Sequence, residues 1–292
     1  MTYTPEGDVY VSPRYLAGPD WCGDAGFVPV KHWPTVHLED GPCQMLITSP
    51  DQRIRIGWYG DDFDVYKISA SEDASSPTRW SATFNDSFPA EIVAAFTTAL
   101  ERDWDTRKEQ DPFLEAPSPY WATRVQPLLD AGWKTQRLPG SVTLGNAGRS
   151  SRADGPFVDV TAPDGTAGVS IDVGSQDPDA ETVLLWAGPS GWNRAEARFT
   201  SRTPAHLIAA TAKALLDPAP VLRYREQLAP ELAALAQLTP LTPPKPPAPT
   251  PLDIQRTQRR PPAITTRSVP RWSTTTSPPA TALPPVGRAA RR

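Results

Sequence analysis

Four side chains near the N-terminus are the residues of this sequence whose types best suit chemistry. Cys22, His32, His37 and Cys43 fall within 22 positions, with nine, four and five residues between them. Thiolate sulfur and imidazole nitrogen are preferred zinc ligands, and four residues between two histidines suits a zinc site. The other gaps do not match the short Cys-x2–4-Cys half-site. The alternative is that the cysteines pack as small apolar side chains and the histidines lie on a polar loop. We expect no bound metal, and these four residues are the candidate ligands.

The same residues could form a cysteine nucleophile with a histidine base, the chemistry of a small hydrolase. Such a pair must meet in space, and cysteines are more often buried than reactive. Asp61, Asp62 and Asp64 could bind a cation, but they lack the glycine and distal glutamate of a calcium loop, so we expect a hairpin tip. The nucleophile-elbow, P-loop and dinucleotide-binding glycine patterns do not occur. We therefore expect no catalytic residue and no cofactor, with a hydrolase or metal-dependent enzyme as the third hypothesis.

The C-terminal segment has the composition of a charged tail. Thr239–Arg292 contains 14 prolines, nine Lys/Arg residues and one acid, which leaves 20 basic and 32 acidic residues in Met1–Leu238. The tail therefore carries a formal charge of +8 and the body −12. Too little apolar surface remains to offset chain entropy, so we expect disorder. Basic clusters can contact nucleic-acid phosphates nonspecifically, or the tail can instead interact with the acidic body. The nucleic-acid candidates are Arg256, Arg259, Arg260, Arg288, Arg291 and Arg292.

The elements that would position these residues repeat along the chain. Three pairs of blocks recur in the same order, with offsets of 106, 113 and 115 residues. Such an order indicates one duplicated unit with insertions in its second copy. The pairs are Asp24-Ala25-Gly26 with Asp130-Ala131-Gly132, Pro50-Asp51 with Pro163-Asp164, and the helix starts Pro89-Ala90 with Pro204-Ala205.

Each unit reads as strands followed by a helix. Ile54, Ile56 and Trp58 alternate with polar residues or glycine, which predicts a strand with one buried face. Apolar residues at helical spacing follow Pro89 and Pro204 in identical register, and Thr203 is placed to cap the second helix. The fold class predicted is α+β, with two tandem repeats, each an antiparallel sheet covered by a C-terminal helix. We expect repeats over 9–110 and 114–219, a linker helix over 220–238 and a disordered Pro/Arg-rich tail over 239–292.

Tryptophans divide into two groups by position. Those on predicted strands or at their starts, Trp58, Trp80 and Trp133, are expected in the core. Others lie near turns or element ends, where aromatic rings often line interfaces but also serve as covers for small cores. This second group is Trp21, Trp33, Trp104, Trp121 and Trp192.

With these elements placed, the chain resembles the actinobacterial SPDY domain family, named after a Ser-Pro-Asp-Tyr turn. The matching pieces are Val11–Gly18, the turn Ser49-Pro50-Asp51-Gln52, and Trp80–Phe84 leading into Pro89–Ile92. The family commonly carries two copies per chain, and the similarity extends over 9–218. Gln52 departs from the motif, as do Ala162 and Gly165 in the second copy. The resemblance supports the architecture and implies no reaction, because the family's function is unknown.

The remaining features bear on location and function. No apolar run approaches the ~20 residues needed to cross a bilayer, the N-terminus does not read as a signal peptide, and two cysteines do not suit a disulfide scaffold. We expect a cytoplasmic protein. The first hypothesis is a non-catalytic interaction protein with an unidentified protein partner and no membrane contact. The second is a nucleic-acid-associated accessory protein that binds through its tail.

Overall fold

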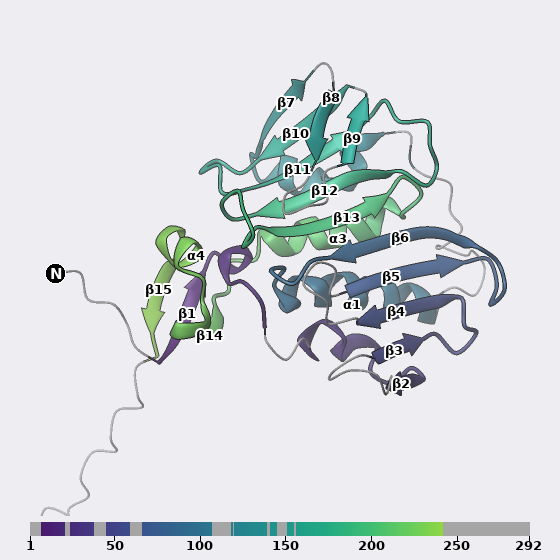
Figure 1. Ribbon diagram of the computed structural model, residues 1–292, viewed down its shortest axis with the longest axis horizontal. Coiled ribbons are helices and arrows are strands. Elements are labelled where there is room, and N and C mark those ends of the chain that lie inside the picture. Colours follow the sequence, from purple (N-terminus) through teal and green to yellow (C-terminus); the bar gives the residue numbers. More distant parts are fainter. Residues whose placement is uncertain are drawn as a thin grey trace, which may run out of the picture. The chain divides into compact units, whose positions relative to one another are not determined.

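The computed structural model describes residues 7–20, 24–37, 45–58, 66–106, 118, 120–138, 141–144, 151–154 and 156–241. The predicted α+β class with antiparallel sheets is confirmed. Ten strands form one antiparallel sheet in the order β2-β3-β4-β5-β6-β13-β12-β11-β10-β7 (Figure 1). The strands before the midpoint are β2 (Thr35–His37), β3 (Met45–Thr48), β4 (Ile54–Trp58), β5 (Tyr66–Ser71) and β6 (Thr78–Phe84). Those after it are β7 (Lys134–Leu138), β10 (Phe157–Thr161), β11 (Ala167–Asp172), β12 (Glu181–Ala187) and β13 (Ala195–Thr200).

The two halves of the sheet meet where β6 pairs with β13. The register places Phe84 opposite Ala197 and Thr83 opposite Arg198. Phe84 and Phe199 are equivalent in the repeat, and Phe199 pairs with Ala82, which is in turn the equivalent of Ala197. Exchanging the halves therefore reproduces the pairing. An approximate twofold axis passes through the Thr83–Arg198 pair and relates the two halves of the sheet.

Side chains extend this short ladder at both ends. The Asn85 side-chain oxygen accepts the backbone N–H of Glu196 at 2.9 Å, and the Thr200 hydroxyl accepts that of Ser81 at 3.0 Å. Asn85 is the repeat equivalent of Thr200, and Ser81 that of Glu196. The two bonds are therefore related by the same approximate axis. The β6–β13 ladder contains only three residue pairs, and these two bonds give the backbone N–H groups beyond its ends a hydrogen-bond acceptor.

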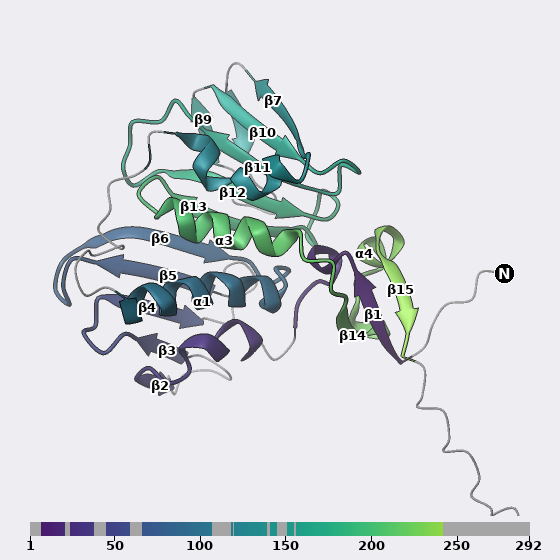
Figure 2. The ribbon, with the colours of Figure 1, turned by 180° about the vertical axis from the view of Figure 1, so that it is seen from behind.

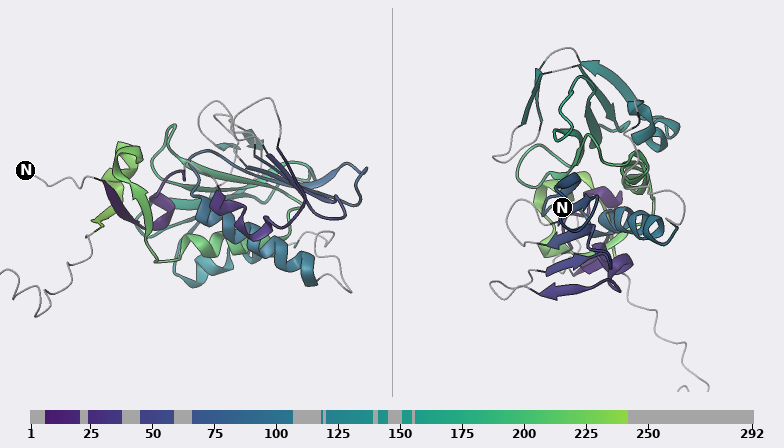
Figure 3. Two further views of the ribbon diagram at one scale, coloured as in Figure 1. Left: turned by 90° about the horizontal axis from the view of Figure 1, so that it is seen from below. Right: turned by 90° about the vertical axis from the view of Figure 1, so that its right-hand side faces the viewer.

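Two helices lie side by side on one face of the sheet (Figures 2 and 3). Helix α1 (Ala90–Thr106) follows β6 and helix α3 (Ala205–Leu215) follows β13. The residues predicted to face the sheet, which include Ile92, Phe96 and Leu207, are fully buried. Phe96 packs against Phe84 and Phe199 at ring distances of 5.7 and 6.0 Å, so α1 covers strands of both halves. One apolar core therefore continues across the midpoint.

The cap expected at the start of α3 differs from the structure. Pro204 occupies the N-cap position, and no side chain makes a capping hydrogen bond. The Thr203 hydroxyl instead donates to the Ser81 carbonyl at 3.1 Å. Thr203 therefore links the second half to β6, because the neighbouring strand supplies a buried acceptor that local sequence does not reveal.

The linker helix expected over 220–238 is also wrong. Val221–Tyr224 forms β14, Pro230–Leu235 forms the short helix α4, and Gln237–Pro240 forms β15. Both strands pair antiparallel with β1 (Asp8–Ser12) in a three-stranded sheet. Strand β1 therefore pairs with the end of the body and not with the sheet of the first half. The helix was predicted from the spacing of the leucines alone. In the structure, β14 and β15 form hydrogen bonds with the two edges of β1, and the local spacing of residues cannot show this pairing.

The remaining described elements are short. A separate two-stranded sheet consists of β8 (Ser141–Leu144) and β9 (Ser151–Asp154). The segment before β7 forms a 3₁₀ turn, Trp121–Arg124, and helix α2, Gln126–Asp130. Other 3₁₀ turns are Arg14–Leu16, Asp24–Gly26, Val28–Val30 and Arg225–Gln227. Among the helices that the structure describes, none is long and apolar enough to cross a membrane.

Candidate functional site

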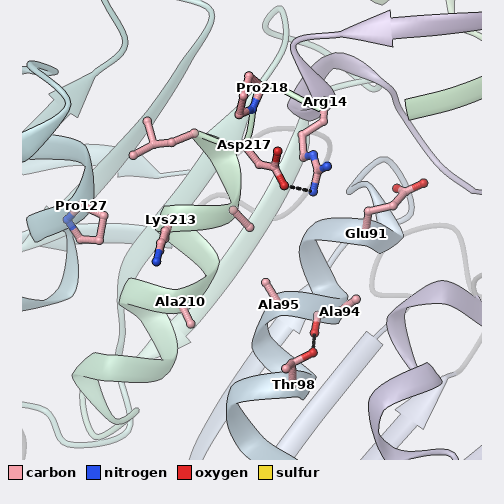
Figure 4. A pocket seen from close by; sticks show the side chains of 12 residues that line it. Arg14, Glu91, Ala94, Ala95, Thr98, Pro127, Ala210, Lys213, Asp217 and Pro218 are labelled. Carbon is pink, nitrogen blue, oxygen red and sulfur yellow. Dashed lines mark hydrogen bonds and ion pairs between the residues drawn. The ribbon is translucent and has the colours of Figure 1, made fainter. Parts of the chain in front are cut away.

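A groove of about 740 Å³ lies between α1 and α3 on the side away from the sheet (Figure 4). Its lining includes Ala94 and Ala95 of α1 and Ala210 and Ala214 of α3. Ala95 and Ala210 are equivalent in the repeat, so the approximate twofold axis brings small side chains together from both helices. Small residues let another backbone approach closely. Small apolar side chains of both helices therefore form the walls of the groove.

Ion pairs close one end of this groove. Arg14 lies 3.0 Å from Asp217, and Arg223 makes two 2.7 Å hydrogen bonds to the Glu91 carboxylate. The Arg14 and Arg223 side chains are only 15% and 10% exposed, so solvent screens these pairs less than it would screen exposed ones. Lys213, on α3, is exposed and makes no ion pair with any residue that the structure describes. It is the cation at the groove whose charge is left unbalanced.

His206 and Asp103 connect the helices at the opposite end. The imidazole of His206 on α3 hydrogen-bonds the Asp103 carboxylate on α1. Asp103 is buried, while the His206 side chain is 35% exposed. Within the described parts of the chain, no hydroxyl or thiol is hydrogen-bonded to His206 as a nucleophile would be. The pair joins the two halves of the molecule.

The face of the sheet opposite the helices differs between its halves. In the first half it carries Arg55 and Lys67 on neighbouring strands, with Arg79 on the next strand. Lys67 is exposed, and Arg79 pairs with Glu72 at 2.9 Å. This gathers positive charge on a body that is acidic as a whole.

In the second half the corresponding face is built around Trp186. Its indole lies over Gly168, where an added Cβ would come within 2.5 Å of the ring. The guanidinium of Arg194, the residue before β13, lies 4.3 Å from the centroid of the Trp186 ring. Burial lowers the Arg194 pKa, and Glu196 and Asp159 oppose that change. This half of the face is therefore packed and not open to charged ligands.

A buried ion pair lies next to the midpoint on this face. Arg198 lies 2.8 Å from Glu196 and 3.4 Å from Glu181. Burial acts to lower the Arg198 pKa, but the hydrogen bond and charge of Glu196 outweigh it and the pKa is raised. The guanidinium is therefore charged and structural.

The motif Ser49-Pro50-Asp51-Gln52 forms the turn between β3 and β4. The Ser49 hydroxyl donates to Asp51 at 2.7 Å and accepts the backbone N–H of Ile54 at 3.0 Å. Gln52 follows with a φ of 61°, and Gly165 holds the same place in the second copy with a φ of 73°. The fourth position thus adopts a left-handed conformation that glycine accepts without strain. The motif forms a hairpin turn and needs no role in chemistry.

The residues predicted to bind zinc are not brought together in the described structure. His32 and His37 are both exposed, and His32 lies 3.9 Å from Glu101. Cys22 and Cys43 fall outside the described residues, as do all six tail arginines. The part of the chain that is described holds no cluster of three or more His, Cys, Asp or Glu residues able to bind a metal. The zinc, hydrolase and tail-binding hypotheses therefore stay predictions from sequence.

The tryptophan assignment was partly correct. Trp80 and Trp133 are buried as expected, and Trp192 is 71% exposed. Trp33, for which both an interface and a core-covering role were open, is 2% exposed and packs edge-on against Trp104 at 5.6 Å. It therefore belongs to the core.

Comparison with known families matches this architecture. The model of the SPDY domain, a domain of unknown function (DUF317), matches the chain twice, at residues 48–104 and 161–221. The chain carries two SPDY domains. No curated protein and no solved structure matches it. The first match includes β4, β5, β6 and most of α1, and the second includes β11, β12, β13 and α3, so each matched segment contains residues of the helix that borders the groove.

Sequence reasoning missed the residues that line the groove and those on the basic face. The alternation of Arg53 and Arg55 with Ile54 and Ile56 did identify a polar face of β4. It could not show that Lys67 would lie beside it, because strand register is a long-range property. Alanines at helical spacing indicated a helix in each copy. They could not show that the two helices would lie side by side with these alanines lining one groove.

Proposed function

We propose that this tandem SPDY protein is a non-catalytic binding protein, and that the groove between α1 and α3 docks a helix of a protein partner. We further infer that each SPDY domain consists of five strands and the helix that follows, over 35–106 and 134–215. The observation that carries the proposal is the alanine-lined groove created by two equivalent helices. Neither domain alone has both walls, so binding requires the tandem arrangement.

The chemistry of the groove selects the occupant. A third helix laid along two antiparallel helices can pack its ridges into the space between them. Alanines in the walls favour a partner face of glycine, alanine or serine. Lys213 favours one acidic residue in that face, because its charge has no partner among the described residues. The expected ligand is an amphipathic helix with small residues and a carboxylate.

Site-specific photo-crosslinking tests this proposal. A photoreactive amino acid replaces Ala95 or Ala210 in the full chain, with replacement of Thr78 on β6 as the control. Both groove positions should crosslink one segment of one protein that Thr78 does not reach. Crosslinks from the two groove positions to unrelated proteins would contradict the proposal.

The crosslinked segment is then synthesised and titrated. Ala210→Trp should weaken peptide binding by roughly tenfold or more, because the indole fills the groove. Lys213→Glu should weaken it about three- to tenfold, and exchanging the peptide's acid for lysine should restore binding. Lys134→Glu, on exposed β7, is the matched control. Equal affinity for wild type and Ala210→Trp would rule out the groove as the docking site.

The basic face of the first domain supports a second candidate, a nucleic-acid-associated protein. Arg55 and Lys67 add a cationic surface to the one predicted for the tail. Contacts to phosphates give affinity that falls steeply with salt and ignores sequence. The acidic body should oppose binding, so the isolated 239–292 segment should bind a duplex more tightly than the full chain does.

One titration series separates the two basic regions. The full chain, its 1–238 fragment, the 239–292 peptide and a full-chain Arg55→Ala/Lys67→Ala variant are titrated with one DNA duplex at two salt concentrations. Loss of affinity on removing the tail assigns binding to the tail, and loss in the double variant assigns it to the sheet. Absence of binding by both the full chain and the peptide at low salt would exclude this candidate.

A further inference from the structure

A small polar cavity lies within the second domain, away from the groove. Its volume is about 140 Å³, and it lies between the 3₁₀ turn Trp121–Arg124 and the ends of β11, β12 and β13. Water occupies about 30 Å³ in the liquid, so the space corresponds to about four or five waters. The polar residues that line it are Ser118, Arg124, Asp172, Ser175, Thr182 and Ser201.

Arg124 is the charged donor of this cavity. It is 8% exposed, and its Nη2 donates to the Ser201 carbonyl at 3.2 Å. Its Nε is buried without a hydrogen-bond partner, and Arg124 forms no ion pair with another described residue. Burial lowers the Arg124 pKa, because the cation has lost water without gaining a countercharge. A buried, unpaired guanidinium N–H is costly, and an anion in the cavity would relieve that cost.

Two further groups make the cavity selective. The Thr182 hydroxyl is buried without a partner, and its residue is 2% exposed. One oxygen of the buried Asp172 carboxylate accepts the N–H groups of Gly174 and Ser175 at 2.8 and 3.0 Å. Its other oxygen has no partner within the described structure. The cavity therefore presents a cation, a hydroxyl and a carboxylate oxygen together.

We propose that this cavity binds a small carboxylate that also carries a hydroxyl or ammonium group. The ligand carboxylate accepts from Arg124 and Thr182, and its hydroxyl or ammonium donates to Asp172. Arginine suits carboxylate because its planar fork offers parallel N–H donors. The first domain has Gly18 at the position equivalent to Arg124, so the site is specific to the second domain. The inference is independent of the groove proposal.

Calorimetric titration and thermal unfolding of the full chain test the site. The probes are glycolate, glycine, acetate and sodium chloride at matched ionic strength. Glycolate or glycine should bind and raise the melting temperature, and acetate should bind about tenfold more weakly, since it offers Asp172 no donor. Equal shifts for all four probes would show a general salt effect and overturn the proposal.

Two variants and one control variant test whether the ligand binds in this cavity. Arg124→Met should abolish the ligand-induced shift, and Arg194→Met, at another desolvated arginine, should keep it. Thr182→Val keeps the shape and removes the unpartnered hydroxyl, so it should raise the melting temperature of the ligand-free protein while weakening glycolate about tenfold or more. Should Arg124→Met fail to fold, Thr182→Val decides alone. Unchanged glycolate affinity in Thr182→Val, or no binding of any probe to wild type, would overturn the proposal.

Discussion

The two SPDY domains share one core but present different faces opposite the helices. Inward-facing Phe84 and Phe199 are both fully buried and pack at 5.8 Å. On the opposite face, Arg55 of the first domain corresponds to Gly168 of the second. These two inward-facing positions are constrained because each ring packs on its own repeat equivalent. Outward-facing positions lack that constraint, and there the copies have diverged into a basic face and a packed one.

The largest effect expected from this comparison lies at these two phenylalanines. Phe84→Ala and Phe199→Ala should each destabilise the protein by about 3–5 kcal/mol, because each removes a buried ring that packs on its equivalent. Denaturant unfolding should show one transition for wild type and both variants. Two transitions, or loss of only one domain's signal, would show that the domains fold separately.

Next in size is the buried ion pair of the second face. Glu196→Ala should cost about 2–3 kcal/mol, since it removes the carboxylate that lies 2.8 Å from the buried Arg198. Ser81→Ala, at the equivalent position of the first domain, should change stability by less than about 0.5 kcal/mol. Urea unfolding of both variants measures the difference. Equal costs would mean that the two faces are energetically alike.

A smaller effect is expected where Trp186 covers glycine. Gly168→Ala should cost about 1–3 kcal/mol, because the new methyl meets the indole. Arg55→Ala, its counterpart, should be within about 0.5 kcal/mol of wild type. The cost of Gly168→Ala should largely vanish in a Trp186→Ala background, a coupling that a double-mutant cycle reports. No coupling would contradict the packed-face account.

The smallest effect concerns Cys22, His32, His37 and Cys43 of the first repeat, which have no equivalents in the second. Protein purified without chelator should contain well under one zinc per chain, and adding chelator should leave the melting temperature unchanged. Elemental analysis and thermal unfolding measure both. If one equivalent of zinc were found and were lost in Cys43→Ser or His37→Ala, the first domain would hold a structural or catalytic metal and the prediction would be wrong.

Local periodicity predicted much of the fold. The alternation around Ile54 and the helical spacing after Pro89 and Pro204 identified β4, α1 and α3, because burial of one face imposes those periods. The same reasoning gave a wrong prediction for the 220–238 segment. Its leucines fit helical spacing, but β14 and β15 gain their hydrogen bonds from β1, more than 200 residues away.

By itself, then, the sequence indicated the duplication, four of the five strands and the closing helix of each half, and the helix side chains that face the core. Those properties follow from local patterns and from comparing one copy with the other. Tertiary structure decided that β6 pairs with β13, that alanines of α1 and α3 line one groove, and that Arg124, Asp172 and Thr182 enclose one cavity. The physical reason is that alternation specifies which face a residue takes, whereas its neighbours depend on register and edge pairing between distant segments.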